Sequence, residues 1–360
     1  MAKKVAIKIT ETENEVARFA EQYHDEAVRE RANSLRAAKF SDDAIKSRLN
    51  NYRYVHTGGI HSGAVLRIGL IDVDGHNFPN LALMKISAYH KRKGDDVEWA
   101  FPMGCYDIVY QSKVFDDTYS PDIEWVPQAK KIIKGGTGYG LDNTLPDEIE
   151  HIYPDYSLYP ELTENTAYGF LTRGCPRHCS FCIVGDKEGL CSVKVADVSE
   201  FWDGQKYIKL LDPNLLACKQ RSELLDQLVR TKAYIDFTQG LDIRLINGAV
   251  IDAINQMRLK QIHFAWDNAN EDLRERFIEY AKNARHKPNG RFGTVYVLTN
   301  YNSTMEENLY RIYTLRDLGY DPYVMVYDKP HAPREIRDLQ RWCNNIRIFR
   351  KCKKFDDYKR

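Results

Sequence analysis

The segment GFLTRGCPRHCSFCIVGDKEG, residues 169–189, places three cysteines, Cys175, Cys179 and Cys182, within eight residues. An apolar run at 169–174 comes directly before them and predicts a strand. Three thiols this close, in a turn rich in Gly and Pro, are expected to converge on one centre. Thiolates are soft ligands for zinc and for iron–sulfur clusters. A closed zinc site needs a fourth protein ligand, which is missing at the usual spacing, whereas a four-iron cluster on three thiolates leaves one iron open. The spacing therefore favours a catalytic metal site over a purely structural one.

Strand patterns alternate with helical patterns through the rest of the chain. After the first strand, further strands are expected at 207–212, 234–243, 261–267, 294–300 and 322–328, which fits a partial or full (β/α) barrel. Chemistry in such folds gathers at the carboxyl ends of the strands. The polar residues at those ends are therefore expected to share one pocket, and the candidates are Asp212, Asn214, Gln239, Asp242, Arg244 and Asp267.

Together these features resemble the radical S-adenosylmethionine (SAM) superfamily, whose signature is Cys-x3-Cys-x2-Cys after the first strand of a (β/α)6 partial barrel. Cys175, Cys179 and Cys182 match it position by position, and Phe181 matches the aromatic residue that usually precedes the last cysteine. The resemblance covers about residues 165–330. It implies that the three cysteines are catalytic and hold a [4Fe-4S] cluster, which cleaves SAM reductively to methionine and a 5′-deoxyadenosyl radical. That radical would abstract a hydrogen atom from the substrate. An electron donor such as flavodoxin or ferredoxin is implied as a partner.

The same resemblance assigns contacts to SAM only by strand position. Asp212 or Asn214 would accept the methionine amino group, in place of the Gly-Gly-Glu motif common in the family. Gln239, Asp242, Arg244 and Asp267 are the candidates for the ribose and the carboxylate. Arg244 offers a fork for that carboxylate, and the alternative is a structural ion pair of Arg244 with Asp242 or Asp267.

The other five cysteines leave a rival hypothesis open. Cys191 could close the metal site as a fourth ligand, which would indicate a non-catalytic module with zinc or a closed Fe–S cluster, for electron transfer or nucleic-acid binding. Cys343 and Cys352, with Cys105 or Cys218, could form an auxiliary cluster. Their scatter along the chain favours free thiols instead.

A different α/β pattern precedes the barrel. VLRIGLIDV at 65–73 predicts a buried strand, the segment 81–94 predicts a helix ending at a Gly, and further strands are expected at 106–115 and 130–140. We therefore expect a small doubly wound, Rossmann-like domain with a parallel sheet over 64–145. It resembles the cobalamin-binding-like domains that often precede radical SAM barrels, with Gly135-Gly136 near the position of their nucleotide-tail glycines. The motif Asp-x-His-x-x-Gly is broken, because Pro79 stands where the Gly after His76 belongs. A degenerate domain is favoured over one that binds cobalamin.

The remaining segments are expected to be a helical N-terminal extension at 1–60, a linker at 146–164, and a basic C-terminal helix or tail at 331–360. Trp342, Phe349, Phe355 and Tyr358 are interleaved with basic residues in that tail. The tail therefore predicts either a helix that covers the barrel or an aromatic-basic surface for nucleic acid.

Composition sets outer limits on the function. With 52 Lys and Arg against 51 Asp and Glu, the net charge of +1 excludes a broad polycationic wrapper of nucleic acid but permits a local basic groove. The absence of a long apolar window predicts no membrane span, and the N-terminus does not have the apolar core of a secretory signal. We expect a cytoplasmic protein with reduced thiols, and we prefer RNA or peptide as its substrate.

Overall fold

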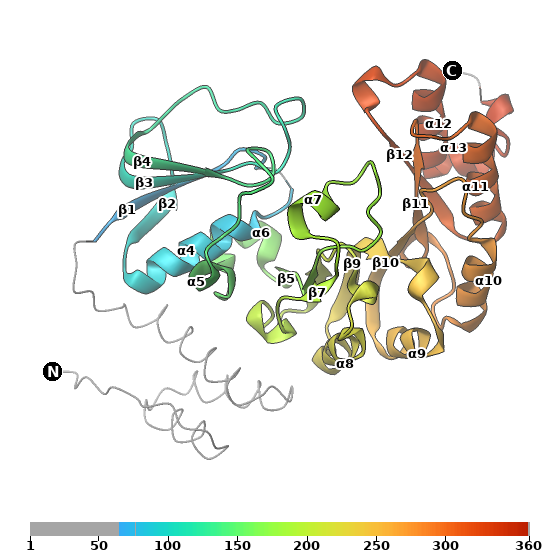
Figure 1. Ribbon diagram of the computed structural model, residues 1–360, viewed down its shortest axis with the longest axis horizontal. Helices are drawn as coiled ribbons and strands as arrows, with labels where there is room; N and C mark the ends of the chain where they lie inside the picture. The colour runs from blue at the N-terminus through green and yellow to red at the C-terminus, as the bar shows by residue number, and fades with distance from the viewer. Residues whose placement is uncertain (1–64, 76, 359–360) are drawn as a thin grey trace, which may run out of the picture. The chain divides into compact units, whose positions relative to one another are not determined.

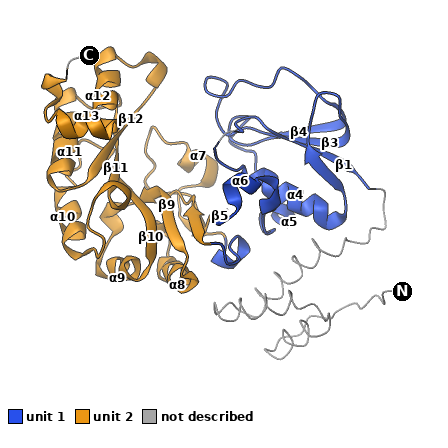
Figure 2. Cartoon of the chain, turned by 180° about the vertical axis from the view of Figure 1, so that it is seen from behind, with its two compact units in different colours: residues 1–167, 196–205 blue, residues 168–195, 206–360 orange. Residues whose placement is uncertain are grey.

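The computed structural model describes residues 65–75 and 77–358, so the extension expected at 1–60 lies outside the described residues. The chain divides into two compact units (Figures 1 and 2). The first unit contains the described residues up to Ala167 together with Ala196–Gln205, and the second contains Tyr168–Val195 and the chain from Lys206 onward. Both units combine helices with parallel sheets, as the sequence predicts.

A four-stranded parallel sheet forms the centre of the first unit. Its strands lie in the order β2-β1-β3-β4, with bounds β1 (Arg67–Asp72), β2 (Asp96–Trp99), β3 (Cys105–Ser112) and β4 (Gln128–Gly135). In the register, Leu70 of β1 lies opposite Trp99 on one side and Tyr110 on the other. The expected parallel sheet is confirmed.

Helix α4 (Leu81–Lys93) joins β1 to β2 where the sequence predicts a helix. The Asn80 side chain accepts a hydrogen bond from the Leu83 N–H at 3.2 Å, and Gly94 ends the helix at φ 82°, a conformation that glycine adopts at little cost. Basic residues fill the last turn, where the helix dipole favours positive charge. Local sequence accounts for both ends of this helix.

The two faces of the first sheet are covered differently. Leu83 and Met84 of α4 pack against Ile68 on one face. On the other face, the described residues that cover the strands include Ile123 and Trp125 from the β3–β4 connection. This differs from a doubly wound domain, which has helices on both faces. Residues 100–104 are too few for a helix between β2 and β3, and two prolines interrupt the loop after β3.

The segment expected to be a linker is part of the first unit. It forms α5 (Asp147–Glu150), the 3₁₀ turn η1 (Tyr156–Leu158) and α6 (Pro160–Thr163). Ile149 and Leu158 join the core around α4, and the Ser87 hydroxyl donates to Asp155 at 2.6 Å. Prolines shorten these helices, but their apolar side chains still bury themselves, which the sequence pattern alone did not indicate.

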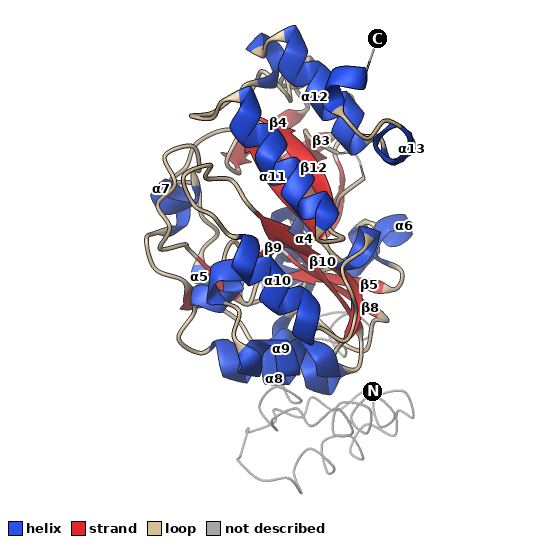
Figure 3. Ribbon diagram, turned by 90° about the vertical axis from the view of Figure 1, so that its right-hand side faces the viewer, coloured by secondary structure: helices blue, strands red, loops and turns tan. Residues whose placement is uncertain are grey.

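The second unit is built on a six-stranded sheet whose strands lie in chain order. From one edge to the other these are β5 (Thr166–Gly169), β8 (Tyr207–Leu210), β9 (Tyr234–Leu241), β10 (Arg258–Ala265), β11 (Thr294–Thr299) and β12 (Asp321–Val326). The pairs from β8 to β12 are parallel. The helices α8 (Arg221–Thr231), α9 (Gly248–Gln256), α10 (Arg274–Asn283) and α11 (Met305–Asp317) connect these strands on one side of the sheet (Figures 1 and 3). The expected strands from residue 207 onward are confirmed.

The first strand differs from its prediction at 169–174. Strand β5 ends at Gly169, and Thr172–Arg173 forms a separate short strand, β6, which pairs antiparallel with β7 (Val193–Lys194). Helix α7 (Val184–Glu188) lies between β6 and β7. The short 3₁₀ turns η2 (Val198–Glu200), η3 (Leu215–Ala217), η4 (Ile243–Leu245) and η5 (Gly290–Phe292) complete the connections between strands.

The side of the sheet that faces the helices is apolar. Side chains from every second strand position are buried there, and they include Ile208, Leu210, Ile235, Phe237, Ile262, Phe264, Val295, Val297 and Val324. This alternation is the period-two pattern of a sheet with one buried face. Folding of the unit therefore depends on one side of its sheet, and the other side is left to polar and aromatic residues.

The C-terminal segment packs as part of the second unit. It forms η6 (Lys329–His331), α12 (Arg334–Asn344), α13 (Ile346–Lys351) and η7 (Phe355–Asp357). Trp342 and Phe349 are 0% and 3% exposed, and the Trp342 indole donates to the Cys352 carbonyl at 3.0 Å. The aromatic-basic surface proposed for this tail is therefore wrong, because its central rings pack against each other instead of facing outward.

Helices in the described part of the chain are short, and the longest, α4 and α11, have 13 residues each. A transmembrane helix needs about 20 predominantly apolar residues. None of the helices that the structure describes is long and apolar enough to cross a bilayer.

Arg311 on α11 ties together the ends of two strands. Its side chain is buried, and its guanidinium donates to the carbonyl oxygens of Trp266 at 2.7 Å, Asp267 at 2.9 Å and Leu298 at 2.9 Å. Burial lowers the pKa of Arg311 to about 10, which leaves the group protonated at neutral pH. One cation thus satisfies three carbonyls where β10 and β11 open into loops.

Replacing Arg311 with Met should destabilise the carboxyl ends of β10 and β11. The substitution leaves three buried carbonyls without a donor, so we expect a loss of about 3 kcal/mol or more in the free energy of unfolding. Hydrogen exchange measured by mass spectrometry should show faster exchange in peptides from β10 and β11. Arg276→Met on α10 is the control, because it removes only an exposed ion pair with Glu279 and should cost less than about 1 kcal/mol. Equal protection in the two variants would contradict this role of Arg311.

Candidate functional site

Residues 174–191, called here the cysteine loop, leave and return to the sheet at one place. Gly174 has φ 83°, and a Cβ at this position would collide with the carbonyl oxygen of Cys191. The Cys175 N–H donates to the Gly189 carbonyl at 3.1 Å, and the Gly174 N–H donates to the Glu188 carboxylate at 3.2 Å. The two ends of the loop are therefore packed closely enough that only glycine fits at residue 174.

The three predicted cluster ligands lie on this loop as free thiols. Cys182 is exposed, and Cys175 and Cys179 are partly buried. Burial raises the pKa of Cys179, and the negative charges of Cys182, Cys175 and Asp267 raise it further. The three sulfur atoms are thus electrostatic neighbours. Among the described residues, no group of three His, Cys, Asp or Glu side chains is placed to hold a single metal ion.

Asn214, a predicted SAM contact, lies against one of these thiols. Its side-chain amide is buried and its Nδ2 donates to the sulfur of Cys175 at 3.5 Å. Its backbone carbonyl accepts a hydrogen bond from the Ser192 hydroxyl at 2.9 Å. The side-chain Oδ1 is buried without a donor. Asn214 therefore positions the first cysteine and keeps one acceptor free for a ligand.

Asp212, the other predicted contact at this strand end, is committed to the backbone. Its carboxylate is buried and accepts from the Thr172 N–H at 2.6 Å, from the Thr172 hydroxyl at 2.7 Å and from the Leu171 N–H at 3.1 Å. These donors belong to the segment that leads into the cysteine loop. Asp212 therefore anchors the start of the cysteine loop, and its predicted contact with SAM stays a prediction.

Substitutions at Asp212 should separate hydrogen bonding from charge. Asp212→Ala leaves two backbone N–H groups and a hydroxyl without an acceptor, so we expect a loss of about 3 kcal/mol or more in the free energy of unfolding. Hydrogen exchange at residues 170–175 should accelerate. Asp212→Asn can keep its amide oxygen at the position of Oδ1 and should retain most of the protection. An Ala variant with native exchange rates in this segment would show that the carboxylate is not the anchor.

The same carboxyl group predicts a pH dependence of stability. Burial raises the pKa of Asp212 from its usual 3.8 to about 6, against the lowering effect of its hydrogen bonds. The native state therefore holds a proton that the unfolded chain has already released. This stabilisation is complete below about pH 4 and is lost as pH rises through 6, a change of about 3 kcal/mol. Denaturant unfolding of the wild type and of Asp212→Asn from pH 4 to 7 measures it. The difference between their free energies of unfolding should decline with pH, and a flat difference would contradict the prediction.

Four charged side chains connect the cysteine loop to the ends of β9 and β10. Arg177, between the first two cysteines, donates to Glu271 at 3.1 Å, and Glu271 also accepts from Arg244 at 2.6 Å. The Nε of Arg244 donates to Asp242 at 2.6 Å. Two cations and two anions therefore form one neutral network, in which the structural ion pair of Arg244 is formed with Asp242 and not with Asp267.

Glu271 is the member of this network that sequence reasoning did not assign to the site. Glu271 follows the strand β10 in a segment whose pattern resembles the start of a helix. Its backbone carbonyl accepts from the Trp266 indole at 2.7 Å, which fixes the loop. No local signal marks such a residue, because its partners are far away in the sequence.

Asp267 lies where the sequence places it, at the end of β10 and within electrostatic range of Cys179. One carboxylate oxygen accepts from the Leu298 N–H at 3.2 Å. Burial raises its pKa to about 6, while Arg311 and Arg244 oppose the shift. One carboxylate oxygen of Asp267 is therefore held by a backbone N–H, and the carboxylate adds negative charge beside the thiols.

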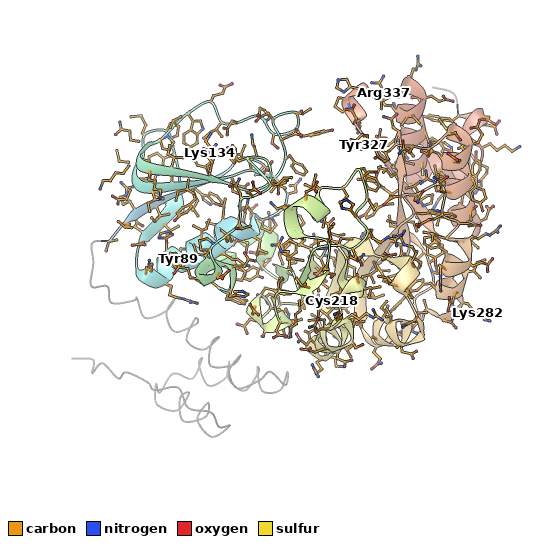
Figure 4. All side chains as sticks on the ribbon, in the orientation of Figure 1. Tyr89, Lys134, Cys218, Lys282, Tyr327 and Arg337 are labelled. Carbon is orange, nitrogen blue, oxygen red and sulfur yellow. The ribbon has the colours of Figure 1, made fainter. Side chains whose placement is uncertain are left out.

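Aromatic rings hold the far side of the cysteine loop. The ring of Phe181 meets Tyr301 edge to face at 5.3 Å, and the hydroxyls of Ser180 and Tyr301 are 2.6 Å apart. Tyr301 follows β11 and contacts Tyr327. Tyr327, which is labelled in Figure 4, follows directly after β12. Phe181 thus orients the loop, and Tyr301 is a further site residue that sequence reasoning missed.

Gln239 is exposed and borders a small pocket beside an irregularity in β9. Ile262 lies opposite Phe237 but Phe264 lies opposite Leu241, so β9 carries extra residues there. Bulges of this kind often redirect side chains next to active sites. The pocket is lined by Asp212 and Gln239 and by apolar side chains of β8 and β9.

The other five cysteines are also free thiols, and they lie in separate surroundings. Cys343 and Cys218 are buried, and the Cys343 thiol donates to the Pro322 carbonyl at 3.3 Å. Cys105, Cys191 and Cys352 are exposed or partly buried. In the described residues these cysteines are not part of any group of three His, Cys, Asp or Glu side chains that could hold a metal ion.

The structure thus gathers Asn214, Asp242, Arg244 and Asp267 around the cysteine loop at the carboxyl ends of the strands, with Asp212 beneath it. No protein-family model matches the chain, and a search of curated proteins finds no significantly similar sequence. The arrangement of these side chains is therefore the basis for any functional argument.

Proposed function

We propose that the second unit is a radical SAM enzyme. The observation that carries the proposal is the position of the Cys-x3-Cys-x2-Cys loop, which follows the first strand of a six-stranded sheet with strands in chain order. Strands in this order, joined by helices on one side, are what a partial (β/α)6 barrel requires. The loop stands at the carboxyl ends, where such folds place their chemistry.

The donor set fits an iron–sulfur cluster. Cys175, Cys179 and Cys182 would hold it, since soft thiolates on one short loop suit iron. Together with SAM, a [4Fe-4S] cluster supplies reductive cleavage of the sulfonium and a 5′-deoxyadenosyl radical that abstracts hydrogen. Asn214 donates a hydrogen bond to one of these sulfurs, an interaction that adjusts a cluster's reduction potential.

Two buried acceptors support a ligand that donates hydrogen bonds beside the cysteines. The Oδ1 of Asn214 and the Oδ2 of Asp242 are buried without hydrogen-bond donors. Unsatisfied buried acceptors are costly, so they are expected where a ligand completes them. An ammonium group and ribose hydroxyls, both present in SAM, are donors of this kind. We assign Asn214 and Asp242 to them.

Arg244 would bind the carboxylate of SAM only after an exchange. Its guanidinium is held by Asp242 and Glu271, and the side chains of Arg244 and Glu271 are 28% and 35% exposed. Ion pairs this exposed contribute little net stability, so a ligand carboxylate can replace Glu271 at low cost. Gln239 and Asp267 remain candidates for the ribose.

For the first unit we propose a fold without a corrinoid. Packing inside the unit accounts for Gly136, because a Cβ at this position would collide with the Lys113 carbonyl, whereas a Cβ on Gly135 would meet no neighbouring atom. The Asp74 carboxylate accepts from the N–H groups of Val114 and Phe115, while His76 lies outside the described residues.

The proposed partners are a flavodoxin or ferredoxin and an RNA or peptide substrate in the reducing cytoplasm.

Anaerobic reconstitution tests the enzymatic proposal. The wild type should bind about four irons per chain and release 5′-deoxyadenosine from SAM when dithionite is supplied. Cys175→Ala, Cys179→Ala and Cys182→Ala should each lose both properties. Cys191→Ser and Cys105→Ser, which replace exposed thiols outside the Cys-x3-Cys-x2-Cys motif, are the matched controls and should retain them.

The rival hypothesis predicts a different result from the same preparation. A chain that binds zinc, that needs Cys191 for metal binding and that leaves SAM intact would be a non-catalytic metal-binding module. That result would end the proposal of a radical SAM enzyme.

A further inference from the structure

The face of the six-stranded sheet opposite the helices carries an aromatic ring on every strand, and it is called here the ring-bearing face. In the register, Tyr207 of β8 lies opposite Tyr234 of β9, and Tyr296 of β11 lies opposite Tyr323 of β12. The rings on the other strands are Tyr168 of β5 and His263 of β10, and His263 stacks on Tyr296 with centroids 5.3 Å apart. This face therefore combines aromatic rings with polar side chains, whereas the helix face is apolar.

At the amino ends of β8, β9 and β10, basic side chains gather on two of these rings. Lys206 and Lys260 lie over Tyr207 at 5.3 and 4.6 Å from the ring centroid, and Arg258 lies 5.9 Å from the centroid of Tyr234. The two rings are 5.6 Å apart. These five residues are called here the aromatic-basic patch. Lys260 is an extra residue at a register shift of β10, which brings it to the same side as Arg258.

The cations of the patch have no acidic partners. Within the described ranges of the chain, Lys206, Arg258 and Lys260 form no ion pair with a carboxylate, and their interactions are those with the tyrosine rings. Lys206 and Arg258 are exposed, and Tyr234 is 37% exposed. Asp236, the next residue on this face of β9, is buried. The patch is therefore an accessible positive surface with ring faces inside it.

We propose that the aromatic-basic patch binds single-stranded nucleic acid. Bases of any sequence can stack on tyrosine rings, and phosphates are neutralised by cations that lack other partners. An acidic peptide would use the cations but would gain little from paired rings.

Because the patch and the cysteine loop lie at opposite ends of β9, about 25 Å apart along an eight-residue strand, one nucleic-acid strand can reach both. As a substrate site the patch rests on the proposed enzymatic function, but binding itself needs neither cluster nor SAM.

Fluorescence anisotropy of the full chain with a labelled 15-nucleotide oligouridylate tests the proposal at several salt concentrations. The double variant Y207A/Y234A should weaken binding by about tenfold or more, while Y207F/Y234F keeps the rings and should bind as the wild type does. The double variant R258Q/K260Q should reduce the slope of log affinity against log salt by about 1.4, because each lost phosphate contact contributes about 0.7. Lys282→Gln, an exposed cation on α10 (Figure 4), is the control and should change affinity by less than about twofold.

Several outcomes would overturn the proposal. One is that the oligonucleotide does not bind, and another is that it binds with equal affinity to the wild type and both double variants. A third is a 15-residue polyglutamate peptide that binds as tightly as the oligonucleotide and is insensitive to Y207A/Y234A. Thermal melting of each variant identifies any that fail to fold. If Y207A/Y234A does not fold, the binding of Y207F/Y234F and of R258Q/K260Q decides the test. If 5′-deoxyadenosine is not formed while the oligonucleotide still binds at the patch, the enzymatic proposal fails alone.

Discussion

The buried carboxylate of Asp212 is the interaction on which the place of the cysteine loop depends. The chain leaves β5 at Gly169, and within three residues its N–H groups turn from strand pairing to the side chain at the end of β8. A buried carboxylate is costly in free energy, and here three hydrogen bonds from Leu171 and Thr172 offset part of that cost, while the remainder raises the pKa of Asp212. Because Thr172 begins the antiparallel pair that carries the loop, one side chain sets the direction in which the cysteines project. Asn214, two residues further along, then contacts the first thiol from the same strand end.

The charge network gives the loop a second attachment with different properties. Arg177, Arg244, Asp242 and Glu271 balance in charge, so the loop is held against the ends of β9 and β10 without a net field of its own. Asp242 is almost buried, but the other three side chains are 28–35% exposed, and solvent weakens their attraction. The hydrogen bonds of Asp212 are therefore buried and costly to break, whereas the partly exposed ion pairs of the network can be rearranged at a small cost in free energy. A site that must admit a charged ligand needs that combination.

Much of this architecture could be predicted from the sequence, because strand periodicity and helix ends are local signals. The strands from β8 to β12 and both ends of α4 fall close to their expected positions. The first strand does not, because the apolar pattern of GFLTRG says nothing about a carboxylate forty residues away that takes its N–H groups. The C-terminal rings were misassigned since Trp342 and its neighbours alternate with basic residues, and only packing against α11 shows that they are internal. Within the site, the cysteines were predictable from spacing. The partners of Arg244 were predictable only in part, because Glu271 belongs to no motif.

The two faces of the six-stranded sheet satisfy different requirements. The helix face explains folding, since its apolar side chains are buried at every second position. The composition of the ring-bearing face needs another explanation. If this face only had to be polar, pairs of threonine, lysine and glutamate would be enough and no aromatic rings would be needed. It carries instead a ring on each strand and, at the amino ends of β8 to β10, cations that form no ion pair with a carboxylate of the described residues. In a chain whose net charge is +1, acidic residues elsewhere must balance this local excess. Where a nearly neutral protein gathers cations that have no carboxylate partner among its described residues, the local positive field favours an anionic partner at that place rather than general adhesion to polyanions.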